Sequence, residues 1–363
     1  KECEIGFFLL SLNRVFLYNR NGDIMKVKLY FENEKGIAKS GIGKALEHQM
    51  KALTLNHIDF SKDHDCKDYD VLHINTVFFG SMKEIKYAKK MNKPIVYHAH
   101  STEEDFRDSF AFSNTIAPLW RKWLIYLYSM GDVIVTPTEY SKKLIEGYGI
   151  DKPVHAISNG IDVDIYPYDQ TKVQAFRDYF QLRDDQKVVM SVGWLFERKG
   201  FDTFCAVAER LPDYTFIWFG DKNLSMPSGN IRKWIENKPE NVILPGYISG
   251  DIILGAYMSS DVFFFPSPEE TEGIVVLEAL AAKCKVLVRD IPVYEGWLFN
   301  GKNCYMANTE DEFAAKITQM VEGKLPDLSA CGYQTAEARG FKAIGEQLAA
   351  VYQEAIERKD AEL

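Results

Sequence analysis

The sequence has no long hydrophobic run and no pair of cysteines at the spacing of metal ligands. Every apolar stretch falls short of the roughly 20 residues that a membrane-spanning helix needs, so any role at a membrane would be peripheral. This cysteine distribution excludes zinc-finger and disulfide-rich secreted classes. It suits a reducing cytoplasm, where buried cysteines act as small hydrophobic residues. The six cysteines are Cys3, Cys66, Cys205, Cys284, Cys304 and Cys331.

The chain also lacks a net positive charge. Its formal charge of −9 argues against nucleic acid as the partner. Residues 1–150 contain 21 Lys and Arg against 19 Asp and Glu, whereas residues 151–363 contain 22 against 33. The near-neutral first part, with its basic clusters, could therefore approach an anionic surface that would repel the second part.

With 363 residues, of which 46% are hydrophobic and 26% charged, the chain suits a globular protein of two domains. From Met25 onward short apolar strands alternate with helices, which predicts an α/β fold with parallel sheets. We predict domains at 25–185 and 186–340, followed by a final helix at 341–363. For residues 1–24, which do not continue the pattern, we expect a leader or upstream segment, or else a membrane-binding amphipathic arm.

The stretch from Pro266 to Leu280, PSPEETEGIVVLEAL, carries the strongest functional signal. The apolar run Asp261–Phe265 before it predicts a strand buried on both faces. Apolar residues then recur at helical spacing from Gly273 onward. The turn between strand and helix therefore lies outside the carboxyl end of a strand, where open α/β sheets bind ligands.

Two carboxylates and a glycine turn at a helix start suit a sugar nucleotide. The amides of Gly273 and Ile274 open the helix, and unpaired first-turn amides together with the helix dipole favour a phosphate. Glu278 lies about one and a half turns inside the helix, where it can accept both hydroxyls of a ribose. Glu270 is placed to meet the hydroxyls of a hexose. Taken alone, the two glutamates could equally be solvated residues at a helix start.

The spacing of Glu270 and Glu278, with seven residues between them on a strand, turn and helix, resembles the signature of the retaining glycosyltransferases of family four. The resemblance implies the GT-B fold, in which two Rossmann-like parallel-sheet domains face a central cleft and the last helix crosses back to the first domain. One departure is that the family usually has Gly-Phe-Gly after the first Glu, whereas this chain has Thr-Glu-Gly. We assign no role to Glu272.

A loop in the second domain is expected to meet the diphosphate. It follows the predicted strand Val188–Val192 and reads GWLFERKGFD, with Arg198 and Lys199 ahead of the next helix. The resemblance implies that both cations are catalytic, because they would stabilise the charge that grows on the leaving diphosphate. The family often has Arg directly after the first Gly, where Trp194 stands, so Arg198 is the expected substitute and Lys199 the better match.

A glycine turn in the first domain is a second candidate for donor binding. Lys39–Gly43 (KSGIG) precedes an apolar-periodic helix predicted at Lys44–Leu55. The resembled family has such a turn near its cleft, where Gly41 and Gly43 would let the sugar phosphate pass. An ordinary turn between strand and helix fits each glycine equally well.

Histidines end two predicted strands of the first domain. His100 follows the strand Pro94–His98 and stands where the resembled family keeps a histidine that contacts the transferred hexose. His98, two residues earlier, would point the same way if the strand continued. His73, near the end of the strand Asp70–Asn75, is better explained as a core residue with its hydrogen bonds satisfied.

Three segments of the first domain suit a membrane surface. Ser101–Leu119 is a long non-periodic connection whose aromatic side chains fit a lipid acceptor or fold back on the domain. Trp120–Met130 carries an apolar stripe that fits an interfacial helix or one packed on the sheet. Lys83–Lys93 has five lysines against one Glu, which fits contact with anionic lipid or an ordinary solvated helix face.

The segments YHAHSTEEDF and PSPEETEGIVVLEALA also look closely like the Gram-positive glycolipid synthases that add a second hexose to monoglucosyl-diacylglycerol. This implies a metal-independent enzyme, peripheral on the cytoplasmic face of the membrane, that transfers glucose from UDP-glucose, or galactose from UDP-galactose, with retention. Glu270 and His100 would orient the hexose while the leaving diphosphate takes the acceptor proton, or Glu270 would act as a covalent nucleophile. Alternatives are transfer to diacylglycerol itself or to a soluble acceptor, a sugar-nucleotide epimerase, and a non-catalytic binding protein.

Overall fold

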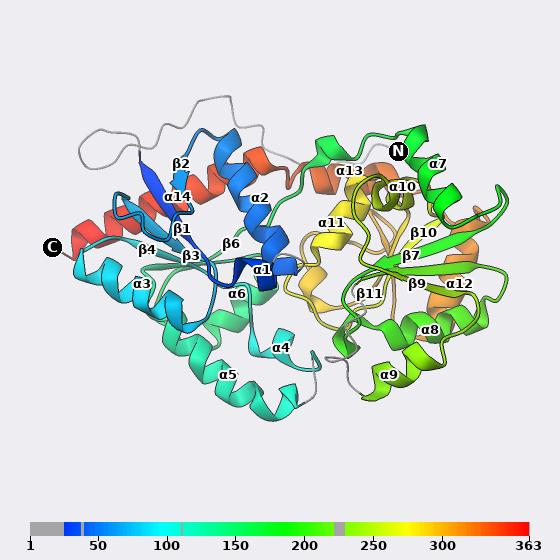
Figure 1. The fold of residues 1–363 in the computed structure, drawn as a ribbon, viewed down its shortest axis with the longest axis horizontal. Coiled ribbons are helices and arrows are strands. Elements are labelled where there is room, and N and C mark those ends of the chain that lie inside the picture. Colours follow the sequence, from blue (N-terminus) through cyan, green and yellow to red (C-terminus); the bar gives the residue numbers. More distant parts are fainter. Residues whose placement is uncertain (1–24, 38–39, 110–111, 221–228, 363) are drawn as a thin grey trace. The chain divides into compact units, whose positions relative to one another are not determined.

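The computed structural model of the chain describes residues 25–37, 40–109, 112–220 and 229–362. The predicted leader at 1–24, and Lys39 of the predicted glycine turn, lie outside the described residues. The described chain divides into two units (Figure 1). The first contains the residues up to His100, Lys122–Gly160 and the residues from Arg339 onward, and the second contains Ser101–Arg121 and Ile161–Ala338.

The first unit is built on a six-stranded parallel sheet in the order β2-β1-β3-β4-β5-β6. Its inner strands are buried along nearly their whole length, as expected for a sheet covered by helices on both faces. The strands are β1 (Lys26–Tyr30), β2 (Asp59–Ser61), β3 (Val71–Ile74), β4 (Ile95–His98), β5 (Val133–Thr136) and β6 (Val154–Ala156).

The helix α14 (Phe341–Ala361) joins the first unit although the whole second unit separates it from the other elements in sequence. Its apolar face, which includes Ile344, Leu348 and Tyr352, shares one buried cluster with residues of β1, β3 and α2. The other helices of this unit are α1 (Glu34–Ile37), α2 (Gly41–Leu55), α3 (Phe79–Lys90), α6 (Glu139–Glu146) and the second part of α5 (Ser113–Tyr128).

The second unit has another six-stranded parallel sheet, in the order β12-β11-β10-β7-β8-β9. Its strands are β7 (Val188–Val192), β8 (Thr215–Phe219), β9 (Val242–Gly246), β10 (Val262–Phe265), β11 (Val286–Arg289) and β12 (Tyr305–Ala307). Its α-helices are α4 (Glu103–Phe106), α7 (Gln170–Tyr179), α8 (Phe201–Arg210), α9 (Gly229–Glu236), α10 (Asp251–Ser259), α11 (Ile274–Ala281), α12 (Glu310–Val321) and α13 (Ser329–Glu337). Short 3-10 turns lie at Val163–Ile165, Glu197–Lys199 and Pro292–Tyr294.

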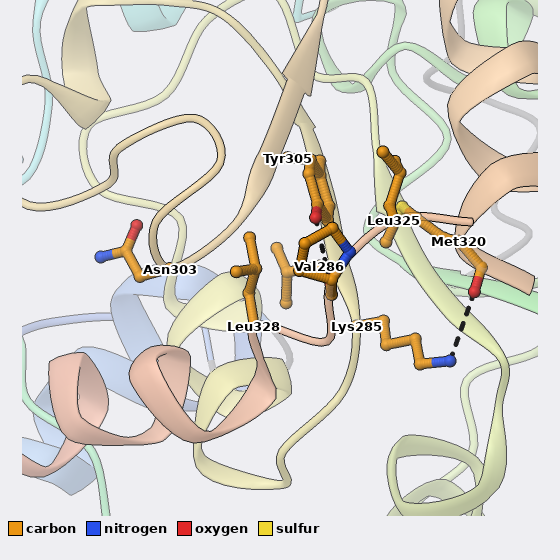
Figure 2. A pocket seen from close by; sticks show the side chains of 8 residues that line it. Lys285, Val286, Asn303, Tyr305, Met320, Leu325 and Leu328 are labelled. Atoms are coloured by element: carbon orange, nitrogen blue, oxygen red, sulfur yellow. Dashed lines mark hydrogen bonds between the residues drawn. The ribbon is translucent and has the colours of Figure 1, made fainter. Parts of the chain in front are cut away.

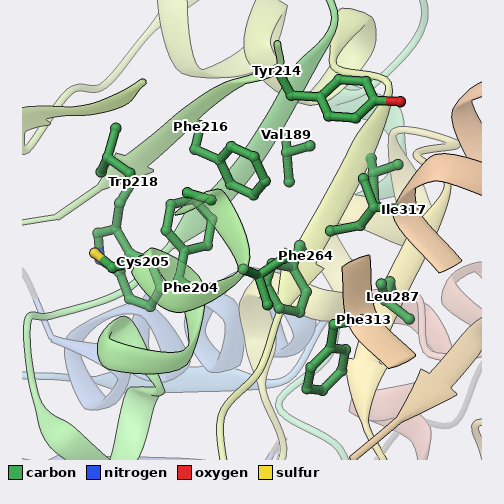
Figure 3. Close-up of a cluster of buried hydrophobic side chains, with 14 of the residues drawn as sticks. Val189, Phe204, Cys205, Tyr214, Phe216, Trp218, Phe264, Leu287, Phe313 and Ile317 are labelled. Atoms are coloured by element: carbon green, nitrogen blue, oxygen red, sulfur yellow. The ribbon is translucent and has the colours of Figure 1, made fainter. Parts of the chain in front are cut away.

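An aromatic core fills one face of the second sheet (Figure 3). Phe204 of α8 lies at its centre, with ring centroids 5.2 Å from Phe216, 5.1 Å from Trp218 and 5.8 Å from Phe264. Phe313 of α12 extends the cluster at 4.9 Å from Phe264. Burying large aromatic side chains contributes the largest apolar areas per residue, so this core fixes α8 and α12 against the sheet.

The predicted α/β fold with parallel sheets is confirmed, and β7 has the predicted bounds. The two units divide after Gly160, whereas the sequence analysis placed the boundary after residue 185. The difference arises because α7 packs on α10 of the second unit. A Cβ added at Gly255 of α10 would lie 2.0 Å from the carbonyl oxygen of Lys172, so the two backbones are in close contact.

Two local predictions are wrong. The connection Ser101–Leu119 is not irregular throughout, because it contains α4 and the first turns of α5. Pro118 lies inside α5, although proline is disfavoured in a helix interior. The predicted glycine turn is likewise the first turn of a helix, since α2 begins at Gly41 with Ser40 as its N-cap.

Candidate active site

The predicted cations and the signature glutamate follow two adjacent strands of the second sheet. β7 and β10 are neighbours, and the connections that leave them run in opposite directions across the sheet. Ligands of open α/β sheets bind at such a point, outside the carboxyl ends of the strands. The loop after β7 carries Arg198 and Lys199, and the loop after β10 carries Glu270.

Close backbone contact joins these two loops. Gly200 has a φ of +74°, and a Cβ added to it would lie 2.6 Å from the carbonyl oxygen of Pro266. The Ser267 hydroxyl donates to the carbonyl oxygen of Arg198 at 2.7 Å. A residue other than glycine at position 200 would therefore separate the loops that carry Lys199 and Glu270.

Lys199 and Glu270 form a buried ion pair between Nζ and Oε1. Their side chains are only 16% and 6% exposed. The Ser267 hydroxyl oxygen also lies 2.8 Å from the same oxygen of Glu270, which is an alternative acceptor for its proton. Burial and the neighbouring charge of Arg198 lower the pKa of Lys199, while Glu270 and Asp105 oppose that shift. An ammonium has three donors, so Lys199 is able to serve a phosphate oxygen as well as Glu270.

Arg198 has different surroundings from Lys199. Its Nη1 lies 2.9 Å from Oδ1 of Asp105, and its Nε donates to the Ser109 hydroxyl at 2.7 Å. Its backbone amide donates to the carbonyl oxygen of Asp108 at 3.2 Å. Arg198 thus holds the segment 105–109 to the second unit, and Lys199 is the cation paired with the signature glutamate.

The helix α11 starts at the predicted place. Its N-cap Gly273 has a φ of +87°, a conformation that favours glycine, and Ile274 opens the first turn. The Tyr294 ring lies behind this turn, with its hydroxyl 3.6 Å from the position of a Cβ added at Gly273. Burial and the charge of Glu270 raise the pKa of Tyr294 well above its usual range. The phenol therefore stays protonated beside the signature loop.

Glu278 is held by two phenols that the sequence analysis did not identify. The Tyr257 hydroxyl donates to Oε2 of Glu278 at 2.8 Å, and Tyr166 also hydrogen-bonds to this carboxylate. Burial and the charge of Glu278 raise the pKa of both tyrosines well above the usual range. Tyr257 lies on α10 and Tyr166 follows a 3-10 turn, so no local sequence pattern linked either residue to α11.

At the carboxyl ends of β3 and β4, the first unit has a stack of three imidazoles. The rings of His98 and His100 lie 3.9 Å apart at 10°, and those of His73 and His98 lie 5.4 Å apart at 27°. His100 Nε2 contacts Asn75 Oδ1 at 3.1 Å, and His73 Nδ1 contacts the Tyr352 hydroxyl at 2.8 Å. Burial lowers the pKa of His73 and His100 to about 3, so these rings are neutral near pH 7.

Gly41 and Gly43, the two glycines predicted to bind the donor, have different environments within α2. Gly41 is exposed, and a Cβ added to it would meet nothing within 4 Å. Gly43 is buried and its amide donates to the Ser40 hydroxyl at 3.3 Å. The Ser40 cap already uses the Gly43 amide, which leaves Gly41 as the more accessible of the two glycines.

A small cavity of the second unit lies away from these loops. The cavity, of about 10 Å³, is lined by Lys285, Tyr305 and Met320 near the amino ends of β11 and β12 (Figure 2). It has room for about one water molecule, which is too small for a substrate. Within the described ranges, no three His, Cys, Asp or Glu side chains are grouped so that they could hold a metal ion.

Protein-family models match both halves of the chain. Residues 48–165 match the family described as Glycosyltransferase Family 4, and residues 172–338 match Glycosyl transferases group 1. The processive diacylglycerol alpha-glucosyltransferase of Acholeplasma laidlawii is 46% identical over 337 residues, which cover 92% of this chain and all of that protein. The alpha-galactosylglucosyldiacylglycerol synthase of Streptococcus pneumoniae is 27% identical over 62% of each chain. Among solved structures, Anabaena Alr3699/HepE in complex with UDP-glucose has a TM-score of 0.73 at 17% identity, covering 91% of this chain and all of that one.

Proposed function

This chain belongs to the glycosyltransferases of family four, and on that premise we propose that it transfers glucose from UDP-glucose to monoglucosyl-diacylglycerol, giving a diglucosyl lipid. The observation that carries the donor half is the buried Lys199–Glu270 pair beside the start of α11, with Glu278 held further along that helix. These groups match the parts of a nucleoside diphosphate sugar: anionic phosphates, a hexose and a ribose.

Different residues of the second unit bind different parts of UDP-glucose. The amides of Gly273 and Ile274 meet a phosphate at the helix start, and Lys199, together with Arg198, stabilises the charge that develops as the diphosphate leaves. Glu270 accepts from hexose hydroxyls. Glu278 accepts hydrogen bonds from the ribose hydroxyls. The two tyrosine hydroxyls that donate to Glu278 fix its orientation before the sugar nucleotide binds.

In the first unit, His100 contacts the transferred hexose. Its neutral imidazole has one donor and one acceptor nitrogen, and Asn75 fixes the ring orientation through Nε2. Gly41 and Gly43 lie beside the sugar phosphate. An oxygen of the leaving diphosphate takes the proton from the acceptor hydroxyl as the new bond forms. The nucleophile is then that hydroxyl, and Glu270 serves as a binding group.

The acceptor is inferred from the relatives. The A. laidlawii relative acts by name on diacylglycerol, and the S. pneumoniae relative makes a glycosylated diacylglycerol that carries two sugars. Both names place a lipid in the acceptor role. Diacylglycerol itself is the second candidate acceptor, because the 46%-identical relative is named as processive.

We further propose that the first unit attaches peripherally to an anionic membrane on its cytoplasmic face. In the part of α5 that belongs to the first unit, Tyr126 is exposed and Trp123 is half-buried, and the preceding turns of the same helix, which belong to the second unit, expose Ile116 and Leu119. α3 packs beside Trp123, since the Phe79 ring lies 5.3 Å from the Trp123 ring. In the part of the chain that the structure describes, no helix has the length and hydrophobicity to cross a bilayer.

Lysines of α3 lie on the same side of that helix as Phe79. Lys83, Lys86 and Lys90 follow Phe79 at positions i+4, i+7 and i+11, so they share its side of α3. All three are exposed. An apolar stripe bordered by cations suits insertion at the headgroup level of an anionic leaflet.

Product analysis tests the proposal. The purified protein is mixed with UDP-glucose, EDTA and vesicles that contain diacylglycerol, monoglucosyl-diacylglycerol or neither, and lipids are analysed by mass spectrometry. We expect a dihexosyl lipid from the monoglucosyl vesicles. Product from diacylglycerol alone would identify the first glycosylation as the reaction, and UDP release without lipid product would reject a lipid acceptor.

A further inference from the structure

We infer that the histidine stack of the first unit is a binding site for an uncharged sugar, namely the glucosyl headgroup of the acceptor, with His98 as its central residue. This inference rests on the proposed function, because it identifies the part of the acceptor that the first unit binds. None of the roles in binding the sugar nucleotide that are proposed above is assigned to His98.

The primary observation is that His98 is buried with both ring nitrogens unused. The side chain is 4% exposed, and neither Nδ1 nor Nε2 has a hydrogen-bond partner among the described residues. Buried polar atoms without a partner cost free energy, and native proteins rarely keep them without a use. The neighbouring rings of His73 and His100 contact His98 only through their faces.

Two amide side chains at the ends of the stack have unused atoms as well. Asn75 contacts His100 through Oδ1, while its Nδ2 has no partner in the described part of the chain. Gln49 contacts His73 through Nε2, while its Oε1 likewise finds no partner there. The stack therefore contains two pairs of open hydrogen-bonding atoms, one pair on His98 and one pair on its flanking amides.

The chemistry of these atoms selects the ligand class. A neutral imidazole offers one donor and one acceptor, Asn75 Nδ2 is a donor and Gln49 Oε1 is an acceptor. Donors and acceptors in equal number, with no formal charge, match hydroxyl groups, each of which donates and accepts. A phosphate would require donors only, and its charge would be costly among buried uncharged groups. Burial also lowers the pKa of His98 well below its usual range, so the ring stays uncharged near neutral pH.

The position of the stack selects the acceptor sugar over the donor sugar. His100, at one end of it, is the residue assigned to the transferred hexose. The acceptor hydroxyl must reach the anomeric carbon of that hexose, so the acceptor headgroup lies next to it. His98 is the immediate neighbour of His100 in the stack at 3.9 Å, and both residues belong to the same unit.

The test compares His98→Phe with His98→Gln. Phenylalanine keeps a flat ring in the stack and removes both nitrogens, whereas glutamine restores one donor and one acceptor. His155→Phe is the matched control, because His155 is a half-exposed residue of β6 that pairs with Glu354, outside the stack. Melting temperatures establish that each variant is folded.

Three quantities are measured for each protein: binding of octyl glucoside by saturation-transfer NMR, transfer to monoglucosyl-diacylglycerol vesicles, and UDP release from UDP-glucose without acceptor. We expect His98→Phe to weaken octyl glucoside binding and lower kcat/KM for the lipid by at least about tenfold, as for two lost hydrogen bonds. UDP release should stay within about twofold of the wild type. His98→Gln should recover part of the loss, and His155→Phe should behave as the wild type.

Other outcomes overturn the inference. Unchanged octyl glucoside binding in a folded His98→Phe protein would mean that the open nitrogens bind only water. An equal loss of UDP release would assign His98 to the donor. The proposed function fails separately, if the wild type modifies neither lipid. The octyl glucoside measurement still decides the inference in that case, because it requires no turnover.

Discussion

The two units have similar parallel sheets but opposite distributions of charge. In the second unit the carboxyl ends of the strands carry the buried Lys199–Glu270 pair and Glu278. In the first unit the corresponding strand ends carry uncharged imidazoles, and an exposed cluster of cations lies on the outer face of α3. The same sheet architecture thus serves ligands of different chemistry, which supports assigning a diphosphate to one unit and uncharged sugar hydroxyls to the other.

The largest effect should come from removing the charge at the strand ends of the second unit. Lys199→Ala leaves Glu270 buried without its cation and removes the proposed donor to the leaving diphosphate. We expect kcat for hexose transfer to fall by about 100- to 1,000-fold, measured by UDP release with the lipid acceptor. Lys187→Ala, at the amino end of β7, is the control. Wild-type turnover in a folded Lys199→Ala protein would remove Lys199 from the mechanism.

The next effect should follow from removing the surface charge of the first unit. Serine at Lys83, Lys86 and Lys90 should weaken binding to vesicles rich in anionic lipid by about a hundredfold at low salt, given about 1 kcal/mol per cation. Sedimentation with vesicles measures this.

Transfer to a soluble acceptor such as octyl glucoside should remain unchanged in the same triple variant. Three exposed lysines elsewhere in the first unit, Lys51, Lys62 and Lys143, provide a matched triple control. If both triple variants lose vesicle binding equally, binding depends on the total charge of the unit and not on α3. Unchanged vesicle binding in the α3 variant would mean that α3 is an ordinary solvated helix.

A smaller effect should be a pH dependence of the unfolding free energy, caused by the uncharged histidines at the strand ends of the first unit. Because the folded chain keeps His73 and His100 uncharged down to about pH 3, the unfolded chain binds more protons below pH 6.5. Stability present above that pH is lost as the pH falls. Between pH 7 and 5 each such histidine should cost about 2 kcal/mol of unfolding free energy. Burial also lowers the pKa of His98, so urea titrations should show a smaller loss of stability for His98→Phe than for the wild type, and parallel curves would mean that His98 is not held neutral.

Sequence reasoning was successful where one segment contained the whole signal. The apolar run before Pro266 and the periodicity after Gly273 predicted β10, the turn and α11 within one or two residues. The spacing of Glu270 and Glu278 fixed their positions on the turn and the helix, and the strand before Arg198 placed the cations at a strand end.

The partners of these residues could not be predicted, because they come from distant segments. Asp105 reaches Arg198 across more than ninety positions of sequence, and Tyr257 and Tyr166 reach Glu278 from separate elements. Local pattern identifies which residues end a strand, and only tertiary packing determines what they contact.

The place of α14 in the first unit sets the order in which the protein can be completed during synthesis. The first six strands leave the ribosome early, yet the helix that covers their sheet and supplies Tyr352 to His73 is translated after the entire second unit. Domains usually fold from the amino terminus onward as they emerge. Here the second unit can acquire its core first, and the earlier-made unit must wait for α14 before its apolar face is covered.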